Sequence, residues 1–98
     1  MFLMPSRYEP CGLNQMYSLK YGTLPIVRAT GGLEDSVDGE TGFKFWGFSG
    51  WDLLGAVRSA LATWANQERW QQMKAAAMTR DFSWEVSAVA YSELYKRL

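Results

Sequence analysis

The stretch Pro5–Gln15 constrains the fold of this chain more than any other part of its sequence. A short apolar run, Phe2–Met4, precedes it and is typical of the end of a buried strand. After it, apolar side chains recur at helical spacing, and Gly22 stands where a helix would stop. The sequence therefore predicts a turn that joins a strand to a helix over residues 11–21.

A turn of this kind is a common place for a ligand. In an open α/β sheet, ligands bind just outside the carboxyl ends of the strands. The start of a helix there offers unpaired backbone N–H groups and the positive end of a dipole, which suit a phosphate. Gly12 lets the backbone come close to a ligand. The carboxylate of Glu9 would repel a second anion, so the pattern predicts a neutral, hydroxyl-rich group beside the phosphate.

The rest of the chain alternates between strand and helix patterns before it ends in helices. Strands are expected over residues 23–28 and 42–46, one helical turn over 33–37, and longer helices over 53–64, 67–77 and 84–96. Pro25 has no N–H group to donate, so its strand is expected at a sheet edge or at a bulge. This order indicates an α/β fold, with a parallel sheet of about three short strands and a C-terminal helical tail.

Capping residues and apolar stripes define the three C-terminal helices. The expected N-caps are Asp52, Asn66 and Ser83, in that order. Side chains expected to face inward repeat every three or four residues, which is the helical period. They are Leu53, Leu54, Val57, Ala60, Leu61 and Trp64 in the first helix, Trp70, Met73 and Ala77 in the second, and Val86, Val89, Ala90 and Leu94 in the last, with Tyr91 beside them.

Composition limits the classes of function. At 98 residues the chain can form at most one small domain. Ten basic and ten acidic residues cancel, which favours neither nucleic acid nor an anionic membrane surface as a partner. The single Cys cannot form an internal disulfide, and the lack of His excludes His-based catalysis and the usual zinc sites. No apolar run approaches the length of a membrane span.

Four segments carry a family resemblance. In chain order they are Ser6–Gln15, Tyr21–Leu33, Gly42–Phe45 and Asp81–Glu85, and they resemble bacterial glycogen synthases and plant starch synthases. Those enzymes are retaining glycosyltransferases with two Rossmann-like domains. The resemblance covers nearly the whole chain but only the last part of the second domain. It implies that residues 1–98 are the C-terminal portion of a nucleotide-sugar-binding domain, a partial Rossmann-like sheet from a glycosyltransferase-B fold.

The resemblance also implies an activity for the parent protein. That activity is transfer of glucose from a nucleoside-diphosphate glucose, ADP-glucose first among them, to the non-reducing end of an α-1,4-glucan with retention of configuration. No cofactor and no metal are expected, because there is no Asp-x-Asp motif and no His cluster. The missing N-terminal domain would be the partner that completes the cleft, so the chain alone is expected to be inactive. The implied location is the bacterial cytoplasm, or the plastid if the parent is plant-like.

Glu9 is the implied catalytic residue. In the family, the matching Glu binds hydroxyls of the donor glucose and stabilises the charge-separated transition state. The usual family pattern places a second Glu eight positions later, where this chain has Tyr17, and that position contacts the ribose. The residues alone leave a structural alternative open. Glu9 could be a solvated loop carboxylate, or a carboxylate in the first turn of a helix that the helix dipole stabilises.

The segment after Glu9 is the implied binding loop for sugar and diphosphate. In the family, backbone N–H groups at the positions of Cys11, Gly12, Leu13 and Asn14 hold both groups. Cys11 is interpreted as a small residue that fills the sugar pocket rather than as a nucleophile. The side chain of Asn14 could add a hydrogen-bond donor, or it could cap the helix.

A second turn follows the second strand. Thr30, Gly31 and Gly32 are assigned to substrate binding, with a tight strand-to-helix turn as the alternative. Arg7 and Arg28 could reach a phosphate, or they could be surface or ion-paired residues.

A non-enzymatic interpretation stays open: a free-standing or truncated nucleotide-sugar-binding module. The strand at Phe2–Met4 is short at its start, so Met1 is interpreted as the beginning of a gene fragment or clone. The last helix, which carries Trp84 and Tyr91, would expose an apolar face if the first domain were absent, and such faces promote association.

Overall fold

Three short parallel strands form the sheet in a computed structural model that describes residues 1–98. They are β1 (Phe2–Met4), β2 (Pro25–Arg28) and β3 (Phe43–Phe45), hydrogen-bonded in the order β1-β2-β3. The helices are α1 (Asn14–Lys20), α2 (Gly32–Ser36), α3 (Gly50–Ala65), α4 (Gln67–Thr79) and α5 (Trp84–Lys96). The predicted α/β fold with a helical tail is confirmed.

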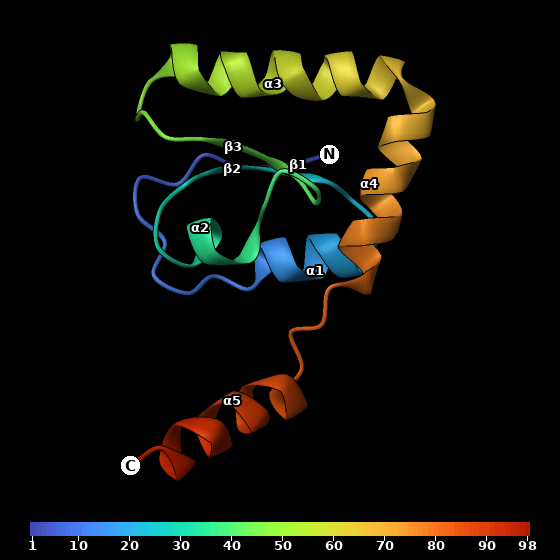
Figure 1. Ribbon diagram of the computed structural model, residues 1–98. Helices are drawn as coiled ribbons and strands as arrows, with labels where there is room; N and C mark the ends of the chain where they lie inside the picture. The colour runs from blue at the N-terminus through green and yellow to red at the C-terminus, as the bar shows by residue number, and fades with distance from the viewer.

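The helices cover both faces of the sheet (Figure 1). The long helix α3 packs on one face against β2 and β3, whereas α1 and α2 lie on the other face. The helix α4 runs along one side of the molecule and contacts both α3 and α1. Because parallel strands connected by helices all point the same way, the turns that follow β1 and β2 open at one edge of the sheet.

The position of Pro25 corrects a prediction. Its strand, β2, is the central strand and not an edge, with Phe2 of β1 paired opposite Pro25 and β3 on the other side. Pro25 is the first residue of the strand, where a missing N–H interrupts no ladder hydrogen bond within the strand. The ladder begins one residue earlier, where the N–H of Phe2 donates to the carbonyl of Leu24 at 3.1 Å.

Buried apolar side chains form three clusters. One lies between α1 and α4 and consists of Leu19, Leu24, Trp70, Met73 and Ala77. The second lies under α2 and the third under α3; they consist of Met4, Val27, Leu33 and Val37, and of Ile26, Phe45, Ala56 and Ala60. Full burial of each large side chain contributes roughly 1.5–3 kcal/mol. The predicted inner face of α4 is confirmed, because all three of its expected residues belong to the first cluster.

The helix α3 differs from its prediction in its cap, and its predicted face is confirmed in part. Ser49, not Asp52, is the N-cap, and its hydroxyl accepts a hydrogen bond from the Asp52 N–H. Ala60 is buried as predicted, together with Ala56, and Leu53 and Val57 pack against the same cluster. Leu61 and Trp64, which were also predicted to face inward, are about half exposed. Two alanines one turn apart let the helix lie close to the sheet, and the larger side chains of Leu53 and Val57 pack beside them.

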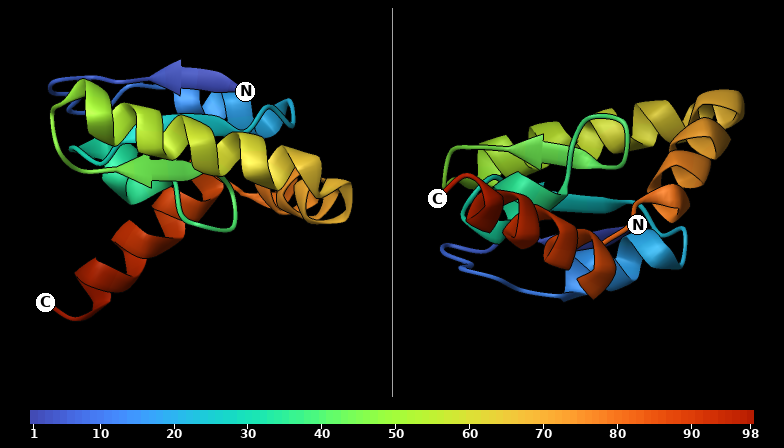
Figure 2. Two further views of the ribbon diagram at one scale, coloured as in Figure 1. Left: turned by 90° about the horizontal axis from the view of Figure 1, so that it is seen from above. Right: turned by 60° about the horizontal axis from the view of Figure 1, so that its bottom comes forward.

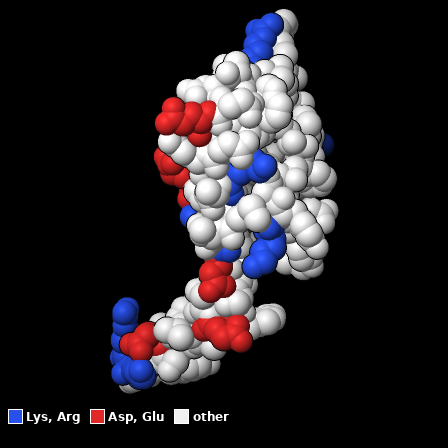
Figure 3. All heavy atoms as spheres, turned by 90° about the vertical axis from the view of Figure 1, so that its right-hand side faces the viewer, with Lys and Arg blue, Asp and Glu red and all other residues white.

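The helix α5 makes little contact with the rest of this chain. None of its residues is buried, and the predicted inner side chains of Val86, Val89 and Leu94 are about half exposed or more. The helix projects from the body (Figure 2) and forms a separate lobe with charges of both signs (Figure 3). The prediction that one side of α5 faces inward is therefore wrong for this chain, because no sheet or helix of the chain covers that side. Ser83 is the N-cap as expected, without a side-chain hydrogen bond to the helix.

None of the five helices is long and apolar enough to cross a membrane.

Candidate functional site

Two turns meet at the carboxyl ends of β1 and β2. The N–H of Gly32 donates a 3.0 Å hydrogen bond to the carbonyl of Glu9. A β-carbon added to Gly31 would lie 2.2 Å from that same oxygen, and one added to Gly32 would lie 3.2 Å from the Cα of Cys11. The two turns thus pack backbone against backbone, and the overlap at residue 31 requires glycine there. Gly31 also has a φ of 50°, which favours glycine.

The side chain of Glu9 folds back over its own loop. A β-carbon on Gly12 would lie 2.8 Å from Cδ of Glu9 and 2.9 Å from its Oε1. The carboxylate makes no hydrogen bond and no ion pair within the chain, although Glu9 is half-buried. It is therefore held in place by packing against Gly12 and keeps its acceptor oxygens free for a ligand.

The loop that follows Glu9 presents free backbone donors. The helix α1 begins at Asn14, later than predicted, so residues 11–13 stay in the loop. The N–H groups of Cys11, Gly12, Leu13 and Asn14 have no backbone acceptor. Leu13 holds the N-cap position, and no side chain caps this helix. The alternative role of Asn14 as a helix cap is therefore wrong, and its exposed side chain remains a free donor.

Tyr17 lies one turn further along α1, away from the packed backbones. It is 57% exposed, and its ring lines a groove of about 680 Å³ between α1 and the segment Arg80–Trp84. Lys20 borders the same groove at the end of α1. Tyr17 is thus on the same helix as the loop that begins at Glu9, but it is not part of the contact between the two turns. Thr30 belongs to the second turn, where its carbonyl accepts the N–H of Leu33 at 3.1 Å.

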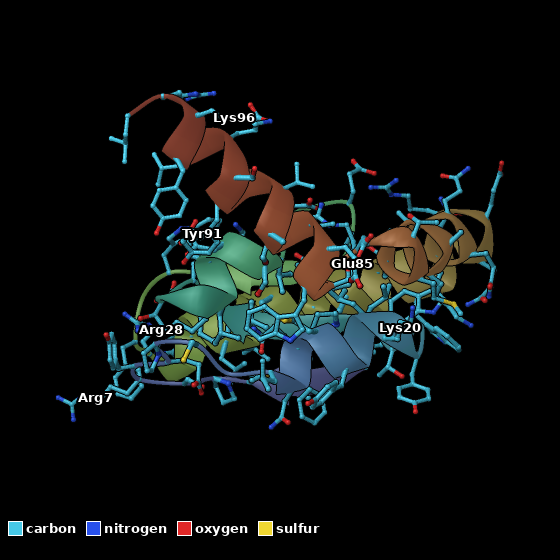
Figure 4. All side chains as sticks on the ribbon, turned by 90° about the horizontal axis from the view of Figure 1, so that it is seen from below. Arg7, Lys20, Arg28, Glu85, Tyr91 and Lys96 are labelled. Atoms are coloured by element: carbon cyan, nitrogen blue, oxygen red, sulfur yellow. The ribbon has the colours of Figure 1, made fainter.

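Arg28 has a structural role at the edge of the site. Its Nε donates to the carbonyl of Trp46 at 3.0 Å and its Nη1 to the carbonyl of Arg7 at 2.7 Å. The guanidinium groups of Arg28 and Arg7 both lie over the ring of Phe48, at 5.5 and 5.6 Å. Arg7 extends outward from the body (Figure 4). These contacts tie the loops after β1 and β3 together, and they occupy Arg28.

One set of polar contacts was not predicted from the sequence. Gln15 is fully buried, and its Nε2 donates to Oγ of Ser36 at 3.0 Å. The hydroxyl of Ser36 in turn donates to the carbonyl of Gly32. A signal was present, because Gln15 and Leu19 occupy the i and i+4 positions that α1 buries. No three side chains of His, Cys, Asp or Glu gather where they could hold a metal ion.

The amino-acid sequence of this chain is similar to one part of several glycogen synthases. No protein-family model matches the chain. A glycogen synthase of Koribacter versatilis is 53% identical over 104 aligned residues, which cover 99% of this chain and 22% of that relative. A glycogen synthase of Anaeromyxobacter sp. is 55% identical, and the match covers 100% of this chain and 22% of that relative. The chain is a homologue of one segment of the glycogen synthases.

A solved structure supports the same conclusion. The catalytic domain of starch synthase IV from Arabidopsis thaliana, bound to ADP and acarbose, matches 99% of the chain with a TM-score of 0.85 and 37% identity. The glycogen synthase resemblance and the expected glycosyltransferase fold are both confirmed. The chain spans about a fifth of the length of these relatives, 22% of each of the three proteins.

Proposed function

We propose that this chain is the donor-binding part of a glycogen synthase. The complete enzyme transfers glucose from ADP-glucose to the non-reducing end of an α-1,4-glucan, with retention of configuration. The observation that carries the proposal is the direct packing of the Gly31–Gly32 turn on the backbone of Glu9, in a segment about half identical to glycogen synthases. The related starch synthase bound to ADP and acarbose supports the same class of donor and acceptor.

The chemistry of the two turns fits a nucleotide sugar. The free N–H groups of residues 11–14 are suited to the diphosphate and to sugar hydroxyls, since they point to no backbone acceptor. The carboxylate of Glu9 accepts hydrogen bonds from hydroxyls of the glucose. As the bond to the leaving diphosphate breaks, positive charge develops at the anomeric carbon, and the same carboxylate stabilises it. Glu9 is thus the proposed catalytic residue.

The other residues that we assign to substrate binding surround the same nucleotide sugar. Cys11 is a small side chain beside the sugar, and the turn of Thr30, Gly31 and Gly32 closes the opposite side. Tyr17, at the mouth of the groove along α1, reaches the nucleoside end. No cofactor and no metal take part in this proposal. Neutralisation of the diphosphate needs basic residues from the rest of the enzyme in addition to the backbone donors.

The proposal also assigns a place for the chain within the enzyme. Residues 1–98 are one unit, the C-terminal portion of the nucleotide-sugar-binding domain. The exposed apolar side chains of α5 pack on the N-terminal domain of the complete protein, which supplies the other wall of the cleft. The complete enzyme works in the bacterial cytoplasm, or in the plastid if the parent is plant-like.

A titration of the 98-residue chain with ADP tests the donor site. Since most of the contacts of a complete cleft lie outside the chain, we expect a dissociation constant no better than roughly 1 mM, which corresponds to about 4 kcal/mol. Amide chemical shifts should move at Gly12–Gln15 and at Gly31–Gly32. Adenosine, which lacks phosphate, is the control and should leave these shifts unchanged. Shifts confined to α5, or none at tens of millimolar ADP, would contradict the assignment.

An activity assay separates this proposal from the alternative of an independent, non-catalytic module. Transfer of radiolabelled glucose from ADP-glucose to glycogen should be at background for the 98-residue chain. When the chain replaces the matching segment of the Koribacter versatilis relative, the resulting full-length protein should transfer glucose. A folded chimera that binds ADP but transfers no glucose would favour the non-catalytic module. Turnover by the 98-residue chain alone would contradict the need for the second domain.

A further inference from the structure

A chain of three hydrogen bonds connects the start of α1 to the backbone of Glu9. The amide of Gln15 donates to the hydroxyl of Ser36, which donates to the carbonyl of Gly32, and the N–H of Gly32 donates to the carbonyl of Glu9. Glu9 and Gln15 flank the loop that presents the free N–H groups. Both flanks of this loop are therefore held by one short helix, α2.

The orientation of the Gln15 amide follows from its neighbours. The hydroxyl of Ser36 carries one hydrogen, and that hydrogen is donated to the carbonyl of Gly32. The hydroxyl can therefore only accept from Gln15, which places the NH₂ group of Gln15 against Ser36. The Oε1 of Gln15 is left fully buried without a hydrogen-bond partner.

An unpaired buried carbonyl is unfavourable for folding. Leaving such an acceptor unsatisfied costs about 1–3 kcal/mol, so an apolar side chain of the same shape would be as stable or more stable at this position. Stability alone therefore does not explain why residue 15 is a glutamine. What glutamine adds, and an apolar side chain cannot, is the hydrogen bond to Ser36 that fixes α1 relative to α2.

We propose that Gln15 and Ser36 are positioning residues of the donor site. Through Gly32, they hold the Glu9 carboxylate and the N–H groups of the following loop in one arrangement that faces a single nucleotide sugar. The effect on ligand affinity rests on the proposed function, whereas the effect on the order of the loop does not. Neither residue touches the ligand in this proposal, because both are buried beneath the loop.

The test uses three single variants of the 98-residue chain and one double variant, which combines Gln15→Met with Ser36→Ala. Gln15→Met keeps the length and volume of the side chain and removes both the hydrogen bond and the unpaired carbonyl. Ser36→Ala removes the middle of the chain of hydrogen bonds. Thr41→Val is the matched control, since Thr41 is also buried and hydrogen-bonded, to Asp38, but lies in the loop before β3. Hydrogen exchange of the Gly32 amide, relative to that of Ala77 in the core of α4, reports the local order of the site.

We expect Gln15→Met to leave the midpoint of thermal unfolding unchanged or raised, and to speed exchange of Gly32 relative to Ala77 about tenfold, equivalent to about 1.4 kcal/mol. Ser36→Ala should speed it similarly. The double variant should do no more than the larger single change, because both remove the same connection. The ADP dissociation constant should rise at least about threefold in each. Thr41→Val should change neither the exchange ratio of Gly32 to Ala77 nor the ADP dissociation constant.

An unchanged exchange ratio in a folded Gln15→Met variant would overturn the proposal, as would equal acceleration of Gly32 and Ala77. A faster Gly32 amide with unchanged ADP affinity would show that the connection orders the loop without positioning the site, and would overturn it too. Failure of the unmodified chain to bind ADP would overturn the proposed function instead, and the exchange ratio would still decide whether Gln15 and Ser36 order the loop.

Discussion

The carbonyl oxygen of Glu9 occupies the space where a side chain of Gly31 would begin. A β-carbon on Gly31 would lie 2.2 Å from that oxygen, much closer than real side chains approach a backbone atom. The φ of 50° at Gly31 adds strain for any other residue. The candidate catalytic residue is thus positioned by the absence of a side chain on the neighbouring turn.

We expect Gly31→Ala to lower the free energy of unfolding by about 2–3 kcal/mol, from the steric overlap together with the positive φ. Urea unfolding followed by tryptophan fluorescence measures the change. Gly55→Ala is the control, because Gly55 lies in α3 and a β-carbon there would have no neighbour within 4 Å. It should raise the free energy of unfolding by about 0.5–1 kcal/mol. Equal stability of Gly31→Ala and the unmodified chain would contradict the close approach of the two turns.

Glu9→Gln tests the charge of the carboxylate in the full-length chimera with the Koribacter versatilis relative. The substitution keeps the shape of the side chain and most of its hydrogen bonding. We expect kcat to fall by about a hundredfold, or about 2.7 kcal/mol, the scale of losing one preorganised electrostatic group. The KM for ADP-glucose should change much less, because the interaction strengthens mainly in the transition state.

Glu68→Gln is the matched control for that experiment. Glu68 lies in the first turn of α4, remote from both turns of the site. Losing its favourable interaction with the helix dipole should lower stability by under about 1 kcal/mol and leave both kinetic constants unchanged. If Glu9→Gln behaved in the same way in a folded enzyme, Glu9 would be a helix-start residue without a role in turnover.

Asp38 should make the stability of the chain depend on pH. Burial raises the pKa of this carboxyl, but hydrogen bonds from the Glu40 N–H and the Thr41 hydroxyl, together with Arg80, lower it below the ordinary 3.8. A pKa that is lower in the folded state gives stability that is present above the unfolded pKa and lost as pH falls through the folded one. The loss of stability caused by Asp38→Asn should therefore be largest above about pH 5. This difference in stability should shrink as pH falls below 3.8 and vanish once pH is below the lowered pKa of Asp38 in the folded state.

Urea unfolding from pH 7 to pH 2 measures that difference, with Asp35→Asn as the control. Asp35 is exposed in the first turn of α2 and makes no ion pair, so its substitution should lower stability by less than about 1 kcal/mol. A constant difference between the Asp38→Asn variant and the unmodified chain across the range would contradict the lowered pKa of Asp38.

The N-cap of α3 can be tested by two substitutions. The hydroxyl of Ser49 accepts from the Asp52 N–H at 3.1 Å and donates to its carboxylate at 2.7 Å. Ser49→Ala should therefore lower the free energy of unfolding by about 1 kcal/mol. Asp52→Asn, which keeps the backbone donor, should cost less than about 1 kcal/mol, because it removes only a favourable charge from the first turn. A larger loss from Asp52→Asn would make Asp52 the main cap.

Local patterns predicted the elements whose partners are close in sequence. Asn66 caps α4 by accepting from the Arg69 N–H at 3.2 Å, and Trp70 and Met73 are buried as their spacing indicates. The same approach predicted Asp52 as the N-cap of α3, whereas the helix begins at Gly50 and Ser49 is its cap. Both residue types are good N-caps, so the residue type alone does not fix where the helix begins.

The sequence by itself determined the α/β order, the strands, the helices α3 and α4 and the resemblance of the segment to the glycogen synthases. Only the tertiary structure decided that Pro25 begins the central strand, that α5 has no cover in this chain, and that the Gly31–Gly32 turn packs on Glu9. It also buried Gln15 against Ser36, 21 residues away. Helical period and capping are set by neighbours along the chain, whereas these contacts depend on sheet order and on which faces the remaining elements cover, and no local pattern specifies either.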